Sequence, residues 1–187
     1  MLKALLVGLI FGVVLTLGGI WWYFSSGRAP VATTDPSLPF ERKLAHASLD
    51  AHLDRQPKSE PAVPADEKNF LAGAEVYKEH CAVCHGLPNV VSTAISEGMF
   101  PKPPKLLEGT GVTDDPAWET YWKAANGIRL TGMPGFKGRL NDFQLWQVSQ
   151  LLANAEKVSP AVKAALAAPL AATSTTAPSA TSVVPTK

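Results

Sequence analysis

Apolar and polar positions divide the chain into four parts, of which the first is the most apolar. After Lys3, residues 4–24 contain no charged side chain, and the run ends in four aromatic residues at 21–24. A helix over this run is about 31 Å long, enough to cross the hydrocarbon core of a membrane, and aromatic residues favour the membrane boundary. We predict that residues 1–24 are a transmembrane signal anchor.

A cleaved secretory signal is the alternative for this segment. Such a signal normally has a shorter apolar run followed by a small-residue cleavage site, and Ser25-Ser26-Gly27-Arg28 is no convincing site. The retained anchor is therefore the favoured interpretation. Lys3 favours a start on the cytoplasmic side, which would put the bulk of the chain on the outer side of the membrane.

The second part, residues 25–65, is predicted to be a spacer with one short amphipathic helix. Ser, Thr and Pro are frequent near both of its ends, which is typical of irregular chain. Residues 40–55 lie between them and favour a helix. Its apolar stripe consists of Phe40, Leu44, Ala47 and Ala51. The sequence leaves open whether this part holds the next domain off the bilayer or docks onto a partner.

The third part, residues 66–155, shows helical periodicity and no convincing strand, so we predict an all-α domain. Its helix-start signals are a capping Asp at 66, an Asp-Pro pair at 115–116 and an N-x-x-Q capping box at 141–144. The predicted helices run over about 66–80, 116–126 and 141–155. Between them lie long connections at 86–114 and 128–140, which are uncommon in so small a domain unless they pack on something.

The fourth part of the chain is predicted to be mostly a tail, and the remaining composition gives no sign of a nucleic-acid partner or of catalytic residues. Residues 156–187 are rich in Ala, Thr, Ser and Pro, and predict a brief helix near 160–168 followed by a disordered tail. The formal net charge of +1 indicates no nucleic-acid partner. We see no Ser/His/Asp or paired-carboxylate constellation, and we predict no catalytic residues.

The only two cysteines of the chain lie in Cys81-Ala82-Val83-Cys84-His85. C-x-x-C-H is the attachment signature of a c-type haem. Each sulfur can reach one vinyl group of the porphyrin, and His85 is then placed under the iron as the proximal ligand. We predict one covalently bound haem c.

Three other interpretations of the two cysteines are weaker. A structural zinc site usually needs four Cys/His ligands, and His46, His52 and His80 do not offer a second paired knuckle. A thioredoxin-like redox pair is expected near a βαβ pattern, which we do not find. A lone structural disulfide would not need His85.

The second axial ligand decides what such a haem does. With a histidine alone the iron could bind gas or peroxide, whereas a methionine in the sixth position raises the potential and favours electron transfer. Met133 lies on an irregular Gly- and Pro-containing stretch between two predicted helices, and Met99 has some of the same character. The residues alone leave both as candidates.

These features make the sequence similar to small membrane-anchored monohaem c-type cytochromes of class I, over about residues 66–155. In that family the first helix carries Gly-x-x-x-aromatic, matched here by Gly73 and Tyr77. The resemblance implies that this helix crosses an aromatic and aliphatic face of the last helix, matched by Trp146 and its neighbours.

The resemblance also implies roles for residues of the site. Pro104-Lys105-Leu106 matches the Pro-x-Leu of the family, whose proline carbonyl accepts the N–H of the proximal histidine and whose leucine lies against the porphyrin. The distal methionine of the family lies in a Gly-Met-Pro context, which fits Met133 and not Met99. The iron ligands implied are His85 and Met133. The haem-binding residues implied are Cys81, Cys84, His85, Pro104, Leu106 and Met133.

The expected function is a membrane-tethered carrier of single electrons in a respiratory or related chain, and not an enzyme. Its haem domain is expected on the periplasmic side of a bacterial inner membrane, where it would meet redox protein partners. The alternative is a fixed cytochrome c subunit of a larger membrane oxidoreductase complex. A haem sensor or peroxidase with an open iron is less favoured.

Overall fold

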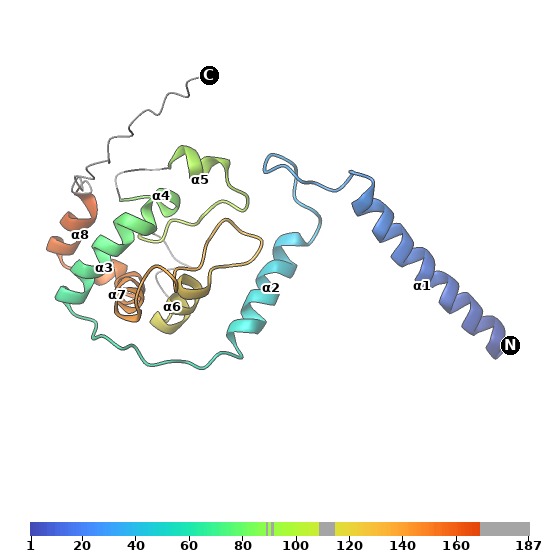
Figure 1. The fold of residues 1–187 in the computed structure, drawn as a ribbon, viewed down its shortest axis with the longest axis horizontal. Helices are drawn as coiled ribbons and strands as arrows, with labels where there is room; N and C mark the ends of the chain where they lie inside the picture. The colour runs from blue at the N-terminus through green and yellow to red at the C-terminus, as the bar shows by residue number, and fades with distance from the viewer. Residues whose placement is uncertain (89, 91, 109–114, 169–187) are drawn as a thin grey trace, which may run out of the picture.

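The computed structural model describes residues 1–88, 90, 92–108 and 115–168. In this part of the chain the regular structure is helical, apart from one isolated bridge between Leu87 and Val90. This confirms the predicted all-α class (Figure 1). The elements, in order, are α1 (Leu2–Ser25), α2 (Glu41–Leu53), α3 (Glu67–His80), α4 (Ala82–His85), α5 (Ala94–Gly98), α6 (Ala117–Asn126), α7 (Asp142–Ala153), the 3-10 turn η1 (Ala155–Lys157) and α8 (Pro160–Ala167).

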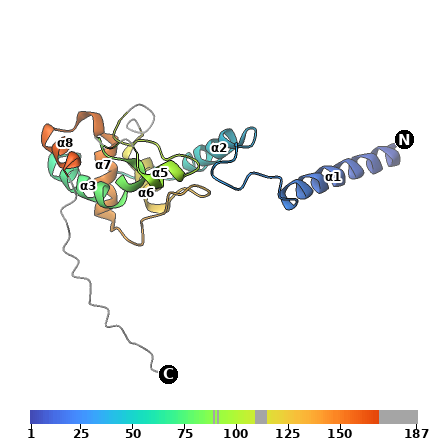
Figure 2. The same ribbon diagram turned by 90° about the horizontal axis from the view of Figure 1, so that it is seen from above.

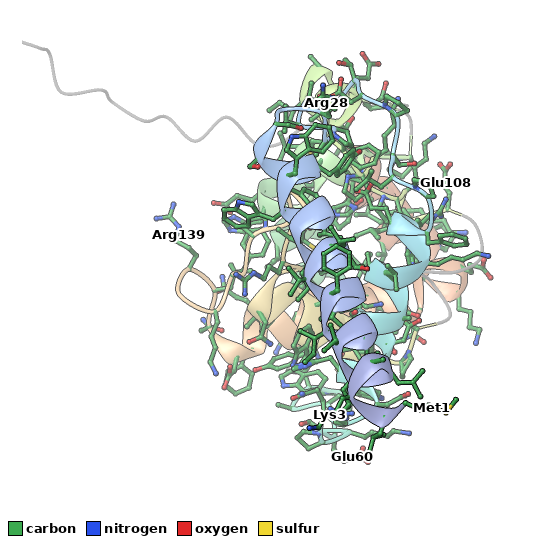
Figure 3. All side chains as sticks on the ribbon, turned by 90° about the vertical axis from the view of Figure 1, so that its right-hand side faces the viewer. Met1, Lys3, Arg28, Glu60, Glu108 and Arg139 are labelled. Atoms are coloured by element: carbon green, nitrogen blue, oxygen red, sulfur yellow. The ribbon has the colours of Figure 1, made fainter. Side chains whose placement is uncertain are left out.

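Helix α1 is long and apolar enough to cross a membrane, and none of its residues is buried. It projects away from the other helices in both views (Figures 1 and 2). Lys3 lies near one end and Arg28 just beyond the other (Figure 3), and the Arg28 guanidinium lies 4.5 Å from the centre of the Trp22 ring. This helix suits a membrane anchor or a signal sequence.

The core of the head, residues 66–167, forms where α3 crosses α7. A Cβ added to Gly73 would overlap the backbone carbonyl of Gln147 and lie 3.1 Å from Cβ of Leu151, so only glycine lets the two backbones approach this closely. Tyr77, one turn further along α3, is fully buried. The expected crossing is present, but the contact is made by Gln147 and Leu151. Trp146 stacks instead on Tyr121 of α6, with ring centres 4.3 Å apart.

Two of the three predicted helix starts have the expected capping bonds. The Asp66 carboxylate accepts the Asn69 N–H at 2.9 Å. Asn141 and Gln144 form both bonds of the capping box at 3.0 Å. These side chains satisfy backbone donors that the first turn of a helix leaves without partners.

The start of α6 differs from the prediction. Pro116 occupies the N-cap position, and the Asp115 carboxylate does not cap the helix. It accepts a bond from Lys123 Nζ at 2.7 Å, and Glu119 lies at the same distance from that ammonium. Burial alone would lower the pKa of Lys123, but the bonds to the two carboxylates outweigh it and raise the pKa. The ion pair therefore replaces the predicted cap.

Two short helices extend the predicted head. Helix α5 lies inside the predicted 86–114 connection and begins at a capping box between Thr93 and Ser96. Helix α8 confirms the brief helix expected near 160–168, and it packs on α3 with Val162 and Leu166 buried. The packed domain therefore continues beyond residue 155. The predicted disordered tail at 169–187 lies outside the described residues.

The predicted spacer is buried at two points, one at the end of α2 and one beyond it. Leu53, the last residue of α2, is only 4% exposed. Val63 is also buried, and its carbonyl accepts a bond from the Gln150 side chain of α7 at 3.0 Å. These contacts hold both ends of the segment between α2 and α3.

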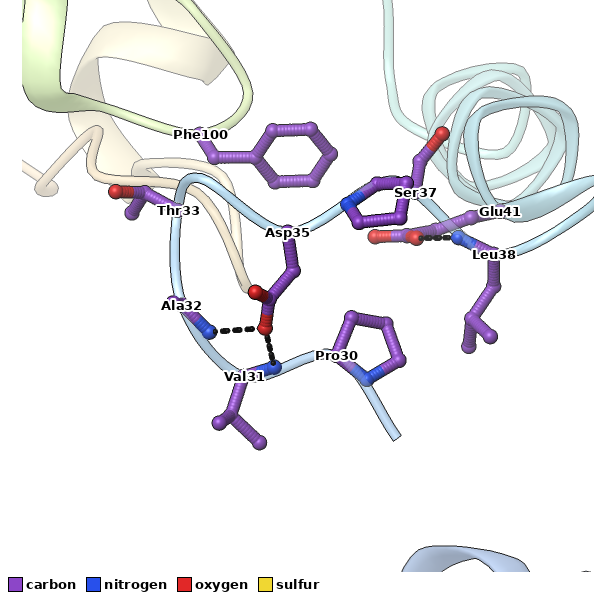
Figure 4. A pocket seen from close by; sticks show the side chains of 10 residues that line it. Pro30, Val31, Ala32, Thr33, Asp35, Ser37, Leu38, Glu41 and Phe100 are labelled. Atoms are coloured by element: carbon purple, nitrogen blue, oxygen red, sulfur yellow. Dashed lines mark hydrogen bonds between the residues drawn. The ribbon is translucent and has the colours of Figure 1, made fainter. Parts of the chain in front are cut away.

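A third contact lies before α2. The chain at 30–41 and Phe100 line a small hollow (Figure 4). Within it the Asp35 carboxylate accepts the N–H groups of Val31 and Ala32 at 2.8 and 2.9 Å, which closes a tight turn. Segment 25–65 is thus partly folded onto the head.

Candidate functional site

The C-x-x-C-H segment forms a corner at the end of α3. Cys81 follows the last residue of α3, and α4 begins at once, with the His85 N–H bonded to the Cys81 carbonyl at 2.9 Å. The chain then turns at Gly86, whose φ of 79° favours glycine. The buried Tyr77 hydroxyl donates to the Gly86 carbonyl at 2.8 Å. The motif is therefore fixed to α3 on both sides.

His85 has the hydrogen bond that the resemblance implies. Its Nδ1 lies 2.7 Å from the carbonyl oxygen of Pro104, nineteen residues further along the chain. Because a carbonyl can only accept, Nδ1 carries the proton and Nε2 keeps a free lone pair. Burial lowers the pKa of His85, and the bond to Pro104 opposes part of that change. The neutral imidazole is the form that binds a metal.

The surroundings of the two cysteines argue against thiol redox chemistry. Neither Cys81 nor Cys84 forms a disulfide, and each is half-buried. Burial, with a smaller effect of Cys84, raises the pKa of Cys81 to about 12, whereas redox-active cysteines have a lowered pKa. Among the described residues no group of three or more His, Cys, Asp or Glu could hold a metal ion. Two unpaired cysteines followed directly by a ligand-ready imidazole fit covalent haem attachment.

Met133 lies on a loop that is held against the end of α6. Gly127 ends α6 with a φ of 71°, and a Cβ added there would lie 2.6 Å from the backbone nitrogen of Gly135. The Met133 N–H donates to the Thr131 hydroxyl at 3.1 Å, and the Met133 carbonyl accepts the Ile128 N–H at 3.3 Å. The backbone of Met133 is thus fixed by its own loop, and its side chain is half-buried.

Met99 reaches the same loop from the other side. It caps the end of α5, and its methyl group occupies the space into which a Cβ on Gly132 would project. Sequence reasoning treated Met99 and Met133 as rivals, whereas the structure brings Met99 against the residue next to Met133. No direct bond joins Met133 to His85, so the role of Met133 as a ligand stays a prediction.

The apolar residues around the site fit a flat apolar cofactor. Leu106, two residues after Pro104, is buried in the main core. Ile95, Phe100 and Leu130 lie on or beside α5 and the Met133 loop and are 56%, 43% and 91% exposed. A haem c held there by Cys81 and Cys84 would supply a reversible one-electron change at its iron.

A C-x-x-C-H corner at the end of a helix, with its histidine bonded to a proline carbonyl, supports a c-type cytochrome domain. In agreement, residues 68–152 match the family model described as "Cytochrome C oxidase, cbb3-type, subunit III". The match spans a little under half of the 187 residues. It includes the C-x-x-C-H motif, Pro104 and the Met133 loop.

The solved structures offer a weaker similarity. A chain of the reducing HAO-like protein complex of Kuenenia stuttgartiensis aligns at 24% identity with a TM-score of 0.42. The alignment covers 57% of this chain and 54% of that one, so it spans about half of the other protein. No curated protein is significantly similar to the chain.

Proposed function

We propose that the protein is a membrane-tethered c-type cytochrome that transfers single electrons through one covalently bound haem. The observation that carries the proposal is the bond from His85 Nδ1 to the Pro104 carbonyl, beside two unpaired thiols. This bond orients the imidazole and makes its free nitrogen a better ligand. The match of this region to a cytochrome c family model supports the same conclusion.

In this proposal the sixth ligand is Met133. A His/Met pair leaves the iron no open position for substrate and raises its potential, which suits electron transfer. The chain contributes the orientation of His85, a fixed loop backbone at Met133 and apolar cover from residues such as Leu106. These are the roles that a protein has when its cofactor carries the chemistry.

The tether in this proposal is α1. Its length and composition suit a single membrane span, and Lys3 at its start favours a cytoplasmic amino terminus. The head would then lie on the periplasmic side of a bacterial inner membrane, within reach of membrane redox proteins. The donor and acceptor would be redox proteins of a respiratory or related chain.

A second candidate is a fixed cytochrome subunit of a larger membrane oxidoreductase. The observation that favours it is the description of the matching family model, which names a subunit of an oxidase. The contacts of Leu53 and Val63 with the head also suit a fixed position rather than a freely moving head. Both candidates use the same haem site. They differ in whether the anchor and spacer tether a mobile electron carrier or hold the haem domain in a fixed position in a complex.

The test begins with the full-length chain purified in mild detergent. We expect a low-spin c-type spectrum in both oxidation states and no spectral change when carbon monoxide meets the untreated ferrous protein. Carbon monoxide binding would instead indicate an iron with an open coordination position. The protein would then be a sensor or a peroxidase-like enzyme, and not an electron carrier. Recovery of a stoichiometric redox partner would favour the subunit, and recovery of the protein alone would favour the mobile carrier.

A further inference from the structure

Helix α2 carries an apolar stripe that the described part of the chain leaves largely exposed. Phe40 and Leu44 are 70% and 66% exposed, and Ala47 and Ala51 are exposed as well. The spacing of Leu44, Ala47 and Ala51 places them on one side of the helix, and Phe40 is the residue at its N-cap. Such a stripe is unusual on a helix that is otherwise in contact with a folded domain.

The opposite side of α2 is the one that meets the head. Leu53 is buried, and the His52 ring lies 5.1 Å from the Trp122 ring of α6. Counting about 100° per residue, Leu53 lies on the far side of the helix from Leu44 and Ala47. His52 lies at the edge of that side, about 80° from Leu44. The stripe therefore cannot turn toward the head unless the contacts at His52 and Leu53 are broken.

The position of α2 indicates what covers the stripe. In both views α2 lies between α1 and the rest of the head (Figures 1 and 2). Residues 26–40 join the two helices, and fifteen residues span at most about 50 Å when fully extended. The turn closed by Asp35 and the bond from the Leu38 N–H to Glu41 shorten that reach. Helix α2 thus begins within less than about 50 Å of the end of the membrane span.

We propose that α2 lies on the bilayer surface, with the stripe of Phe40, Leu44, Ala47 and Ala51 in contact with lipid. The inference rests on the membrane tether of the proposed function. Four small or medium apolar side chains bind a bilayer weakly on their own. The tether makes their binding intramolecular, so a weak contact is enough to hold the helix down.

This contact would fix the orientation of the haem domain. The side of α2 away from lipid holds the head through Leu53 and His52, and Val63 adds a second point of attachment. The head would then stand at one height and present one side to partners that move in the same membrane. Helix α2 would act as a bracket between bilayer and head, in place of a flexible spacer.

The test compares two neighbouring positions of α2 in the full-length haem protein. Ala47→Cys places a spin label on the stripe, and His46→Cys places one on an exposed position off it. Haem attachment occupies Cys81 and Cys84, so each variant has one free thiol. The protein is reconstituted in phosphatidylcholine nanodiscs, because the charges on α2 are balanced and apolar contact is the expected attraction. A third label at Val13→Cys reports on α1.

Power-saturation spectroscopy then measures the access of oxygen, which concentrates in lipid, and of a water-soluble nickel complex. We expect the label at 47 to lose nickel access and gain oxygen access relative to the label at 46, and the label at 13 to be in lipid. Equal nickel access for the labels at positions 46 and 47, with the label at position 13 in lipid, would overturn the bilayer contact and leave the tether intact. Loss of both reagents at 47 would indicate a protein partner and overturn it too. A water-exposed label at 13 would overturn the tether and this inference together.

Discussion

The two sides of the candidate haem site are built differently. On the proximal side, Cys81, Cys84 and His85 are neighbours in sequence, and a single side-chain bond to Pro104 orients the imidazole. On the distal side, bonds to Thr131 and Ile128 fix the backbone of Met133, and Met99 comes from the end of α5 to lie against Gly132. The proximal residues other than Pro104 are neighbours in sequence, whereas the contact of Met99 with Gly132 depends on tertiary packing.

This difference indicates which side of the site holds the haem in the protein and which side can adjust the reduction potential of the haem. The proximal corner is bonded to α3 through Tyr77 and Gly86, so its geometry is shared with the core. The distal loop depends on close backbone approach at Gly127 and Gly135. The sixth ligand strongly affects haem potential, and we therefore expect distal changes to alter potential while proximal changes remove the haem.

The largest expected effect comes from breaking the proximal side. Replacing both Cys81 and Cys84 with alanine should abolish covalent haem, because no other cysteine exists in the chain. Haem staining after denaturing electrophoresis measures this directly. Val83→Ala, at an exposed position inside the same motif, is the matched control and should keep its haem. Covalent haem in the double variant would show that the attachment site lies elsewhere.

The next effect concerns the backbone of the distal loop. Gly135→Ala would place a Cβ 2.7 Å from the backbone of Asn126, and overpacking of this kind typically costs about 1–3 kcal/mol. We expect Gly135→Ala to destabilise the protein in urea titrations and to weaken the methionine-to-iron charge-transfer band while the haem stays attached.

Gly138→Ala is the control for that variant, because an added Cβ there meets nothing within 4 Å. It should leave both the band and the urea midpoint unchanged or slightly raise the midpoint, since alanine restricts the unfolded chain. If Gly135 and Gly138 variants behave alike, the distal loop is not held by close backbone approach.

A smaller effect is expected at Gly132. A Cβ there meets only the methyl end of Met99, and this flexible side chain can rotate away. Gly132→Ala should therefore shift the haem potential with little loss of stability, as measured by redox titration beside urea titration. Adding Met99→Ala should cancel the shift, because it frees the same space. A shift that persists unchanged in the double variant would refute the contact as its cause.

The smallest effect is expected at Pro104. Pro104→Ala keeps the backbone carbonyl that accepts the His85 N–H, so the haem and its proximal ligand should be retained. The loop gains freedom in the unfolded state, and we expect a loss of about 0.4–1 kcal/mol in the free energy of unfolding. Loss of haem or a change to high-spin iron would show that the proline ring itself, beyond its carbonyl, positions His85.

Local sequence signals predicted most of the helices. The capping residues Asp66 and Asn141 mark helix starts because their side chains bond to backbone donors only a few residues away. The cap that the sequence predicts at Asp115 is absent, because an ion pair with Lys123 competes with capping for the same carboxylate. Helix α5 had a readable signal in Thr93 and Ser96, and was missed because the helix is only five residues long.

The candidate site was predictable to different degrees on its two sides. The family resemblance implies a hydrogen bond from His85 to the Pro104 carbonyl, and the structure has this bond at 2.7 Å. The approach of Met99 to Gly132 depends on how two irregular segments pack, and no local pattern encodes it. The same is true of Val63, whose carbonyl accepts a bond from Gln150 of α7, far away in the sequence.

The central claim is a haem ligated by His85 and Met133, and two single variants test it most directly. The ferric spectrum of the full-length protein should show a methionine-to-iron charge-transfer band. We expect Met133→Ala to abolish this band and lower the potential, with the haem still covalently bound. Met99→Ala should keep the band. Loss of the band in Met99→Ala with its retention in Met133→Ala would contradict the assignment and make Met99 the ligand.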